Sequence, residues 1–120
     1  MIICLSAIGD SLDAQLDPTF GRAARFMFVD SETNQSTPVV NSPGAHGAGV
    51  QSAQIVIDRN AAVVITGRIG PNAFSVLDAA GIKVYVNASG TVRDALAAFQ
   101  AGTLEQANAP TGRQHQGGSR

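Results

Sequence analysis

The stretch that decides the fold is AAVVITGRIGPN, residues 61–72. Its first six residues are almost entirely apolar and do not alternate with polar ones, which predicts a strand buried on both faces. Glycines at positions 67 and 70 then predict a turn. Pro71 favours the first turn of a helix, where its missing N–H leaves no hydrogen bond unmade. A buried strand followed at once by a helix is typical of α/β proteins with parallel strands.

The same two patterns recur on both sides of this unit. Helices are predicted where apolar residues recur at helical spacing, over 48–59, 71–80 and 91–101. Thr91 followed by Asp94 has the spacing of a capping box at the start of the third helix. Strands are predicted for the short apolar or β-branched runs 2–6, 25–30, 35–40, 61–66 and 82–86. The element order is therefore βββαβαβα.

This order predicts one α/β domain over residues 1–106. Three consecutive strands form an antiparallel meander, and two right-handed crossovers add two parallel strands. The result is a five-stranded mixed sheet of order 3-2-1-4-5 with three helices on its faces. Pro38 places the third strand at an edge because proline cannot donate to a neighbouring strand. Residues 107–120 contain almost no apolar side chains, which predicts a flexible C-terminal tail.

Three polar loops are expected to leave the same edge of this sheet, because four of the five strands would run in one direction. They are the loop 7–24 and the glycine-rich turns 41–49 and 66–72. Ligands of open α/β sheets bind at the carboxyl ends of the strands. Helix starts also present free N–H groups and a dipole that favour negative charge. We therefore predict an anion-binding pocket at this edge.

The side chains and glycines of these loops make up the predicted site. Glycine lets a ligand approach the backbone amides closely, and arginine presents a rigid fork of donors to an anion. The histidine in the first turn would ligate a metal or pair with the anion. The predicted cofactor-binding residues are Arg22, His46, Gly47, Gly49, Gly67, Arg68, Gly70 and Asn72, and the one candidate metal ligand is His46.

Other polar residues of the loop 7–24 have simpler interpretations. Arg25 is expected to form a surface ion pair with Asp13, Asp17 or Asp30. Asp17 and Pro18 predict a turn. The lone cysteine, Cys4, lies in a predicted buried strand and is expected to act as a small hydrophobic residue.

Composition excludes several classes of function. The net charge of the 120 residues is −1, which does not favour nucleic-acid binding. A single cysteine rules out an intrachain disulfide framework. The start of the chain lacks the basic and long apolar regions of a signal peptide, and no apolar run approaches the roughly 20 residues that span a bilayer. We expect a cytoplasmic protein with no membrane or nucleic-acid partner.

Several motifs resemble those of the nitrogenase iron–molybdenum cofactor biosynthesis family. They are DPTFGR at 17–22, HGAG at 46–49, VITGRIGPNA at 64–73 and GIKVY at 81–85. Matching segments span roughly residues 2–104. That family includes cofactor carriers and the molybdenum–copper orange proteins. The resemblance implies a ribonuclease H-like fold and the binding of metal–sulfur clusters or their precursors rather than catalysis.

The cysteine content restricts which cluster could bind. A conventional iron–sulfur cluster takes about four cysteine thiolates, whereas this chain has one cysteine. The cluster must therefore contain its own sulfides, as an anionic thiometallate does. With the resemblance, this favours a molybdenum–copper sulfide cluster. An iron–molybdenum cofactor precursor is the alternative, and a protein partner for cluster delivery is a further expectation.

Enzymatic activity is not expected. Two-metal nuclease chemistry needs clustered carboxylates, but the first strand contains no acidic residue. The chain also lacks a Walker A lysine, a dinucleotide fingerprint and a nucleophile elbow. A phosphate- or nucleotide-binding regulatory module remains an alternative, because helix starts do not distinguish phosphate from a thiometallate.

Overall fold

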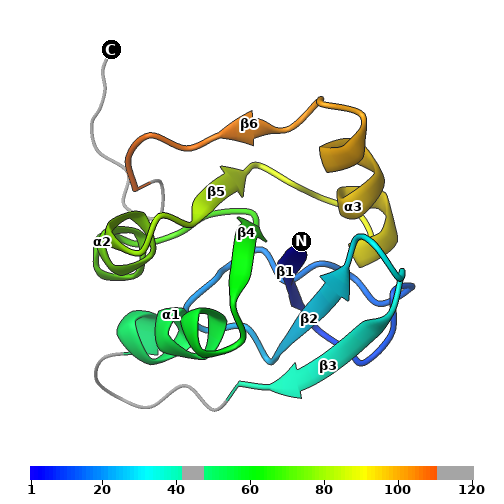
Figure 1. The fold of residues 1–120 in the computed structure, drawn as a ribbon, viewed down its shortest axis with the longest axis horizontal. Coiled ribbons are helices and arrows are strands. Elements are labelled where there is room, and N and C mark those ends of the chain that lie inside the picture. Colours follow the sequence, from blue (N-terminus) through cyan, green and yellow to red (C-terminus); the bar gives the residue numbers. More distant parts are fainter. Residues whose placement is uncertain (42–47, 111–120) are drawn as a thin grey trace.

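A computed structural model describes residues 1–41 and 48–110 of the chain (Figure 1). In chain order, the elements of these residues are β1 (Ile2–Ala7), β2 (Arg25–Asp30), β3 (Ser36–Val40), α1 (Ala48–Asp58), β4 (Ala61–Ile65), α2 (Pro71–Ala79), β5 (Lys83–Val86), α3 (Val92–Gln100) and β6 (Glu105–Gln106). Every predicted strand and helix is present, and β6 is an addition.

The strands form one mixed sheet of order β3-β2-β1-β4-β5-β6. β1 pairs antiparallel with β2 and parallel with β4, and β4 pairs parallel with β5. The predicted order 3-2-1-4-5 is confirmed, with β3 at an edge, but the prediction of five strands was wrong. β6 pairs antiparallel with β5 through Tyr85 with Gln106 and Val86 with Glu105. Both β6 residues are exposed, so no apolar pattern indicated a strand.

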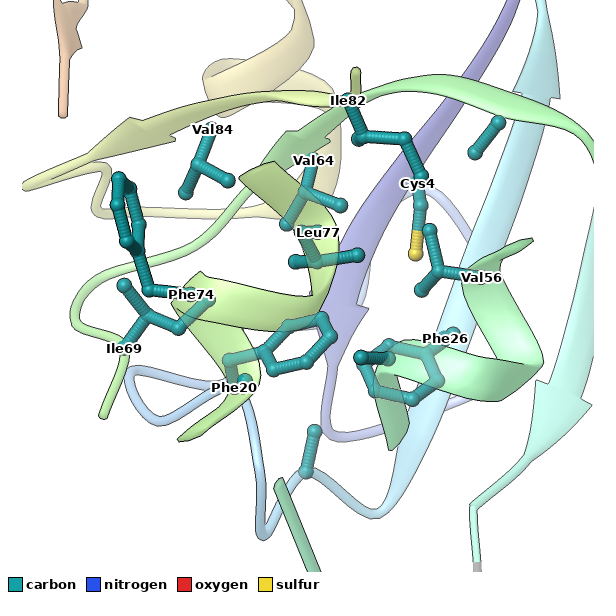
Figure 2. Packing of buried hydrophobic residues seen from close by; sticks show 14 of the residues in the cluster. Cys4, Phe20, Phe26, Val56, Val64, Ile69, Phe74, Leu77, Ile82 and Val84 are labelled. Carbon is teal, nitrogen blue, oxygen red and sulfur yellow. The ribbon is translucent and has the colours of Figure 1, made fainter. Parts of the chain in front are cut away.

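Both faces of the sheet are covered, which explains the unbroken apolar runs of its central strands. α1 and α2 lie on one face and α3 on the other (Figure 1). In β2, Phe26 and Phe28 join the cluster under α1 and α2, whereas Met27 and Val29 join the cluster under α3. Figure 2 shows the first cluster, in which the Phe20 and Phe26 ring centroids lie 5.0 Å apart.

The helix ends follow the sequence signals. Pro71 occupies the first turn of α2, and Gly81 follows the helix with a positive φ of 78°, as expected for a glycine terminator. At α3, the Thr91 hydroxyl accepts from the amide of Asp94 at 3.0 Å, and the Asp94 carboxylate accepts from the amide of Thr91 at 3.1 Å. The predicted capping box is therefore confirmed.

The described chain continues a few residues beyond β6. Ala107, the first residue of the predicted tail, is buried, and its amide donates to the carbonyl oxygen of Val84 at 2.8 Å. Residues 111–120, the greater part of that tail, lie outside the described residues.

Cys4 lies in the middle of β1 and is fully buried in the cluster of Figure 2. Burial raises the pKa of the Cys4 thiol well above its ordinary value, because the thiolate would lose its hydration. The thiol therefore stays neutral in the folded protein at pH values where an exposed thiol ionises. Such a cysteine is a packing group and not a metal-binding thiolate.

Cys4→Ser is expected to lower the free energy of unfolding by about 1–3 kcal/mol, because it places a hydroxyl in an apolar cluster. Urea denaturation measures this difference. The stability difference between the two proteins should also shrink above pH 8.5, near the ordinary thiol pKa. There, ionisation of Cys4 in the unfolded chain lowers the stability of the parent protein alone. Equal stabilities at neutral pH would contradict the buried placement of the thiol.

Candidate functional site

The carboxyl ends of β1, β3, β4 and β5 lie at the same end of the sheet, as their pairing directions require. We call this end the carboxyl edge. The segments that leave this edge are residues 8–24, the chain after Val40, residues 66–70 and residues 87–91. Within the described residues, these segments contact one another through hydrogen bonds. The predicted convergence of the loops 7–24 and 66–72 is therefore confirmed.

The long loop between β1 and β2 is held along its length. Its first half runs beside the start of α3, where the Val92 amide donates to Ala14 O at 2.9 Å and the Arg93 amide to Leu12 O at 2.8 Å. Its second half begins at Asp17, whose carboxylate accepts from the amides of Thr19 and Ala24 at 3.1 and 3.3 Å. The predicted turn at Asp17 and Pro18 is an Asx turn of this kind.

The second half then runs beside the turn that follows β4, and Thr19 and Arg68 form a parallel bridge. The Arg68 amide donates to Pro18 O at 2.8 Å, and the Phe20 amide donates to Arg68 O at 3.1 Å. Glycine is required at position 67, where the two segments are in contact, because a Cβ atom there would lie 2.5 Å from Pro18 O and 3.0 Å from Pro18 Cα. The structure thus gives Gly67 a packing role between two loops. Its predicted contact with a ligand is a separate matter and stays a prediction.

The starts of α1 and α2 lie side by side at the same edge. A Cβ atom on Gly49 in α1 would lie 3.3 Å from Ala73 Cβ and 3.4 Å from Ala73 N in α2. Gly70 caps α2 without a side-chain hydrogen bond, and a Cβ atom there would contact nothing within 4 Å. The first-turn amides, including that of Asn72, have no intrahelical acceptor. Two helix dipoles therefore direct positive potential to one place.

Both predicted arginines of the site are exposed and free of ion pairs within the described part of the chain. Arg22 follows Phe20 in the loop between β1 and β2, and Arg68 lies in the turn that is hydrogen-bonded to this loop. The ion pairs that the structure contains use other cations: Met1 with Glu32, Arg25 with Asp10, and Arg93 with Asp13. Arg25 forms an ion pair as expected, but with Asp10 instead of the three partners considered. The charges of Arg22 and Arg68 thus remain available to an anion.

Sequence reasoning missed four buried polar residues beside this edge, namely Ser6, Asn41, Ser52 and Thr66. The hydroxyl oxygens of Ser6 and Thr66 lie 2.8 Å apart, and the Ser6 hydroxyl donates to Asp17 O at 2.6 Å. These bonds join the carboxyl ends of β1 and β4 to Asp17, where the second half of the loop between β1 and β2 begins. Their signal in the sequence is a polar residue, Ser6 or Thr66, at the last position of a predicted apolar strand.

His46 and Gly47 lie outside the described residues, so the predicted metal ligand has no position here. Among residues 1–41 and 48–110, no group of three or more histidine, cysteine, aspartate or glutamate side chains is placed to hold a metal ion. Nor do those residues include a helix that is long and apolar enough to cross a membrane.

Comparison with known proteins shows which family the chain matches. Residues 1–102 match the family described as "Dinitrogenase iron-molybdenum cofactor". An uncharacterised protein of Methanocaldococcus jannaschii is 31% identical over 97 residues, which are 77% of this chain and 82% of that protein.

Two solved structures are similar over nearly their whole length. The apo form of the orange protein from Desulfovibrio gigas is 42% identical, with a TM-score of 0.87, and the match covers 91% of this chain and 94% of that one. A putative NifB protein from Thermotoga is 30% identical, with a TM-score of 0.80, and the match covers 98% of each chain. The α/β fold with a mixed sheet is therefore shared with both proteins.

Proposed function

The chain belongs to the dinitrogenase iron–molybdenum cofactor family, and from that premise we propose that it binds an anionic metal–sulfide cluster without transforming it. The cluster occupies the carboxyl edge of the sheet, where the protein stores it or carries it to a further protein in the cytoplasm. This role needs a preformed binding surface and no catalytic group.

The observation that best supports this proposal is the pairing of two helix starts beside two free arginines. Gly49 and Ala73 bring the first turns of α1 and α2 together, and both turns point N–H groups at the same edge. Arg22 and Arg68 supply two positive charges that no described carboxylate neutralises. Terminal sulfides or oxygens of a cluster would accept hydrogen bonds from these groups, and its negative charge would be stabilised by them.

A molybdenum–copper sulfide cluster fits the ligand set better than an iron–sulfur cluster. The only thiol of the chain is Cys4, which is buried and neutral, so the protein offers no thiolate for iron. A cluster that brings its own sulfides needs few protein ligands. The similarity to the orange protein of Desulfovibrio gigas supports the same choice, and an iron–molybdenum cofactor precursor is the alternative.

His46 is proposed as the one protein ligand or hydrogen-bond partner of the cluster, because neutral imidazole binds copper and imidazolium pairs with an anion. His46→Ala is expected to weaken the uptake of tetrathiomolybdate with copper, with urea denaturation as the check that the variant folds. Unchanged uptake would remove His46 from the site without affecting the arginine contacts.

The proposal is tested by purifying the untagged protein under anaerobic conditions and recording its visible spectrum and metal content. We expect a coloured protein that contains molybdenum, and apo-protein that takes up tetrathiomolybdate with copper. Molybdate, inorganic phosphate and ATP serve as controls and should bind far more weakly. A colourless, metal-free protein that binds ATP but not tetrathiomolybdate would instead establish the regulatory alternative.

A further inference from the structure

Two buried polar side chains flank the loop that contains Arg22, and neither belongs to the predicted site. Asn41 directly follows β3 and is 5% exposed, and Ser52 lies in α1 and is 0% exposed. Burial of such groups is unfavourable unless they form hydrogen bonds. Their partners therefore indicate what they contribute.

Both side chains bond to backbone carbonyls on either side of Arg22. The Asn41 side-chain amide donates to Ala23 O at 2.8 Å, and the Ser52 hydroxyl donates to Gly21 O at 3.1 Å. Ser52 Oγ and Asn41 Oδ1 lie 3.3 Å apart, so the two groups also meet each other. We call Asn41, Ser52 and these two carbonyls the carbonyl clamp. It fixes the backbone immediately before and immediately after Arg22.

The rest of the loop leaves the backbone of Arg22 little freedom. Phe20 and Ala23, on either side of it, are fully buried. The Asn41 backbone amide also donates to Ala24 O at 3.1 Å. The Arg22 side chain itself is exposed and forms no ion pair with any described residue. A rigid backbone thus holds a cation that pairs with no carboxylate among the described residues.

We propose that Asn41 and Ser52 are positioning residues that hold Arg22 ready for the anionic cluster. The inference rests on the proposed function and deepens it. Ser52 belongs to α1, the helix whose first turn borders the same edge, so the clamp joins Arg22 and that turn in one rigid unit. A cation held in place before binding loses less conformational freedom on binding, and this raises affinity without a contact of its own.

A double-mutant cycle between Arg22 and Ser52 tests the proposal, with tetrathiomolybdate as the probe. Arg22→Ala should raise the dissociation constant about tenfold, the effect of one charge-assisted hydrogen bond. Ser52→Ala should raise it about threefold to fivefold through loss of positioning. The double variant should bind within about twofold of Arg22→Ala, because an absent arginine cannot be positioned. Additive effects of the two substitutions would overturn the proposal.

Thr103→Ala is the matched control for Ser52→Ala. It removes a 3.0 Å hydroxyl bond to Ala98 O beyond the end of α3, and it should leave probe binding unchanged. The amides of Ala23 and Ala24 donate to Phe20 O and to the Asp17 carboxylate, and their hydrogen exchange should accelerate in Ser52→Ala but not in Thr103→Ala. Asn41→Leu keeps a side chain of similar size and adds no charge but loses the amide donor to Ala23 O, so it provides a second variant with the same expected behaviour.

The outcomes separate the two proposals. If Arg22→Ala weakens binding but Ser52→Ala and Asn41→Leu do not, the positioning role is wrong and the proposed function stands. If the parent protein does not bind tetrathiomolybdate at all, the proposed function is wrong and the clamp has no ligand for which to position Arg22.

Discussion

Gly67→Ala is expected to lower the free energy of unfolding by about 2–4 kcal/mol, the cost of forcing atoms into a packed site. The added Cβ atom would lie 2.5 Å from Pro18 O and 3.0 Å from Pro18 Cα. Backbone atoms cannot move away as a flexible side chain can. The two loops would have to separate, which would break the hydrogen bonds between Arg68 and Pro18 and between Phe20 and Arg68. Urea denaturation measures the change in stability.

Gly70→Ala is the matched control, because the same substitution three residues later meets nothing within 4 Å. Its φ of −79° is open to alanine, so only the weaker preference of alanine for a helix cap applies, at about 1 kcal/mol or less. A Gly67→Ala protein as stable as Gly70→Ala would show that the two loops do not pack against each other as described. Gly67→Ala should also bind tetrathiomolybdate poorly, because Arg68 lies in the disturbed turn.

The sequence predicted the central strands well because both faces of the sheet are buried. In β1, β2 and β4, burial on two sides requires apolar residues at nearly every position, and such runs are easily recognised. β6 has the opposite character, because Glu105 and Gln106 are both exposed and are held by backbone pairing with β5 and by a 2.8 Å hydrogen bond that the Asn87 side-chain amide donates to the Glu105 carboxylate. No side-chain pattern records an interaction of that kind.

The candidate site was predicted in outline but not in its supporting bonds. Arg22 and Arg68 were chosen for their residue type and loop position, and the structure leaves both free of ion pairs among the described residues. Asn41 and Ser52 were missed because their partners are backbone carbonyls 18 and 31 residues away. Any residue type can supply a carbonyl, so a single sequence contains no signal for such a bond.

Replacing Arg22 and Arg68 together by alanine is expected to raise the dissociation constant for tetrathiomolybdate about a hundredfold. Each guanidinium should contribute about one charge-assisted hydrogen bond, which corresponds to roughly tenfold in affinity. Neither side chain forms an ion pair with a described residue, so the free energy of unfolding should change by less than about 0.5 kcal/mol. Isothermal titration and urea denaturation measure the two quantities on the same samples.

The double variant Arg25→Ala/Arg93→Ala separates a local site from the general charge of the protein. It also removes two positive charges, but these belong to arginines that are already paired with Asp10 and Asp13. If the anion is held by Arg22 and Arg68 at short range, this control should bind nearly as tightly as the parent protein. If both double variants weaken binding equally, and added salt abolishes the effect in both, the attraction is long-range. The carboxyl edge would then not be a specific binding site for the ligand.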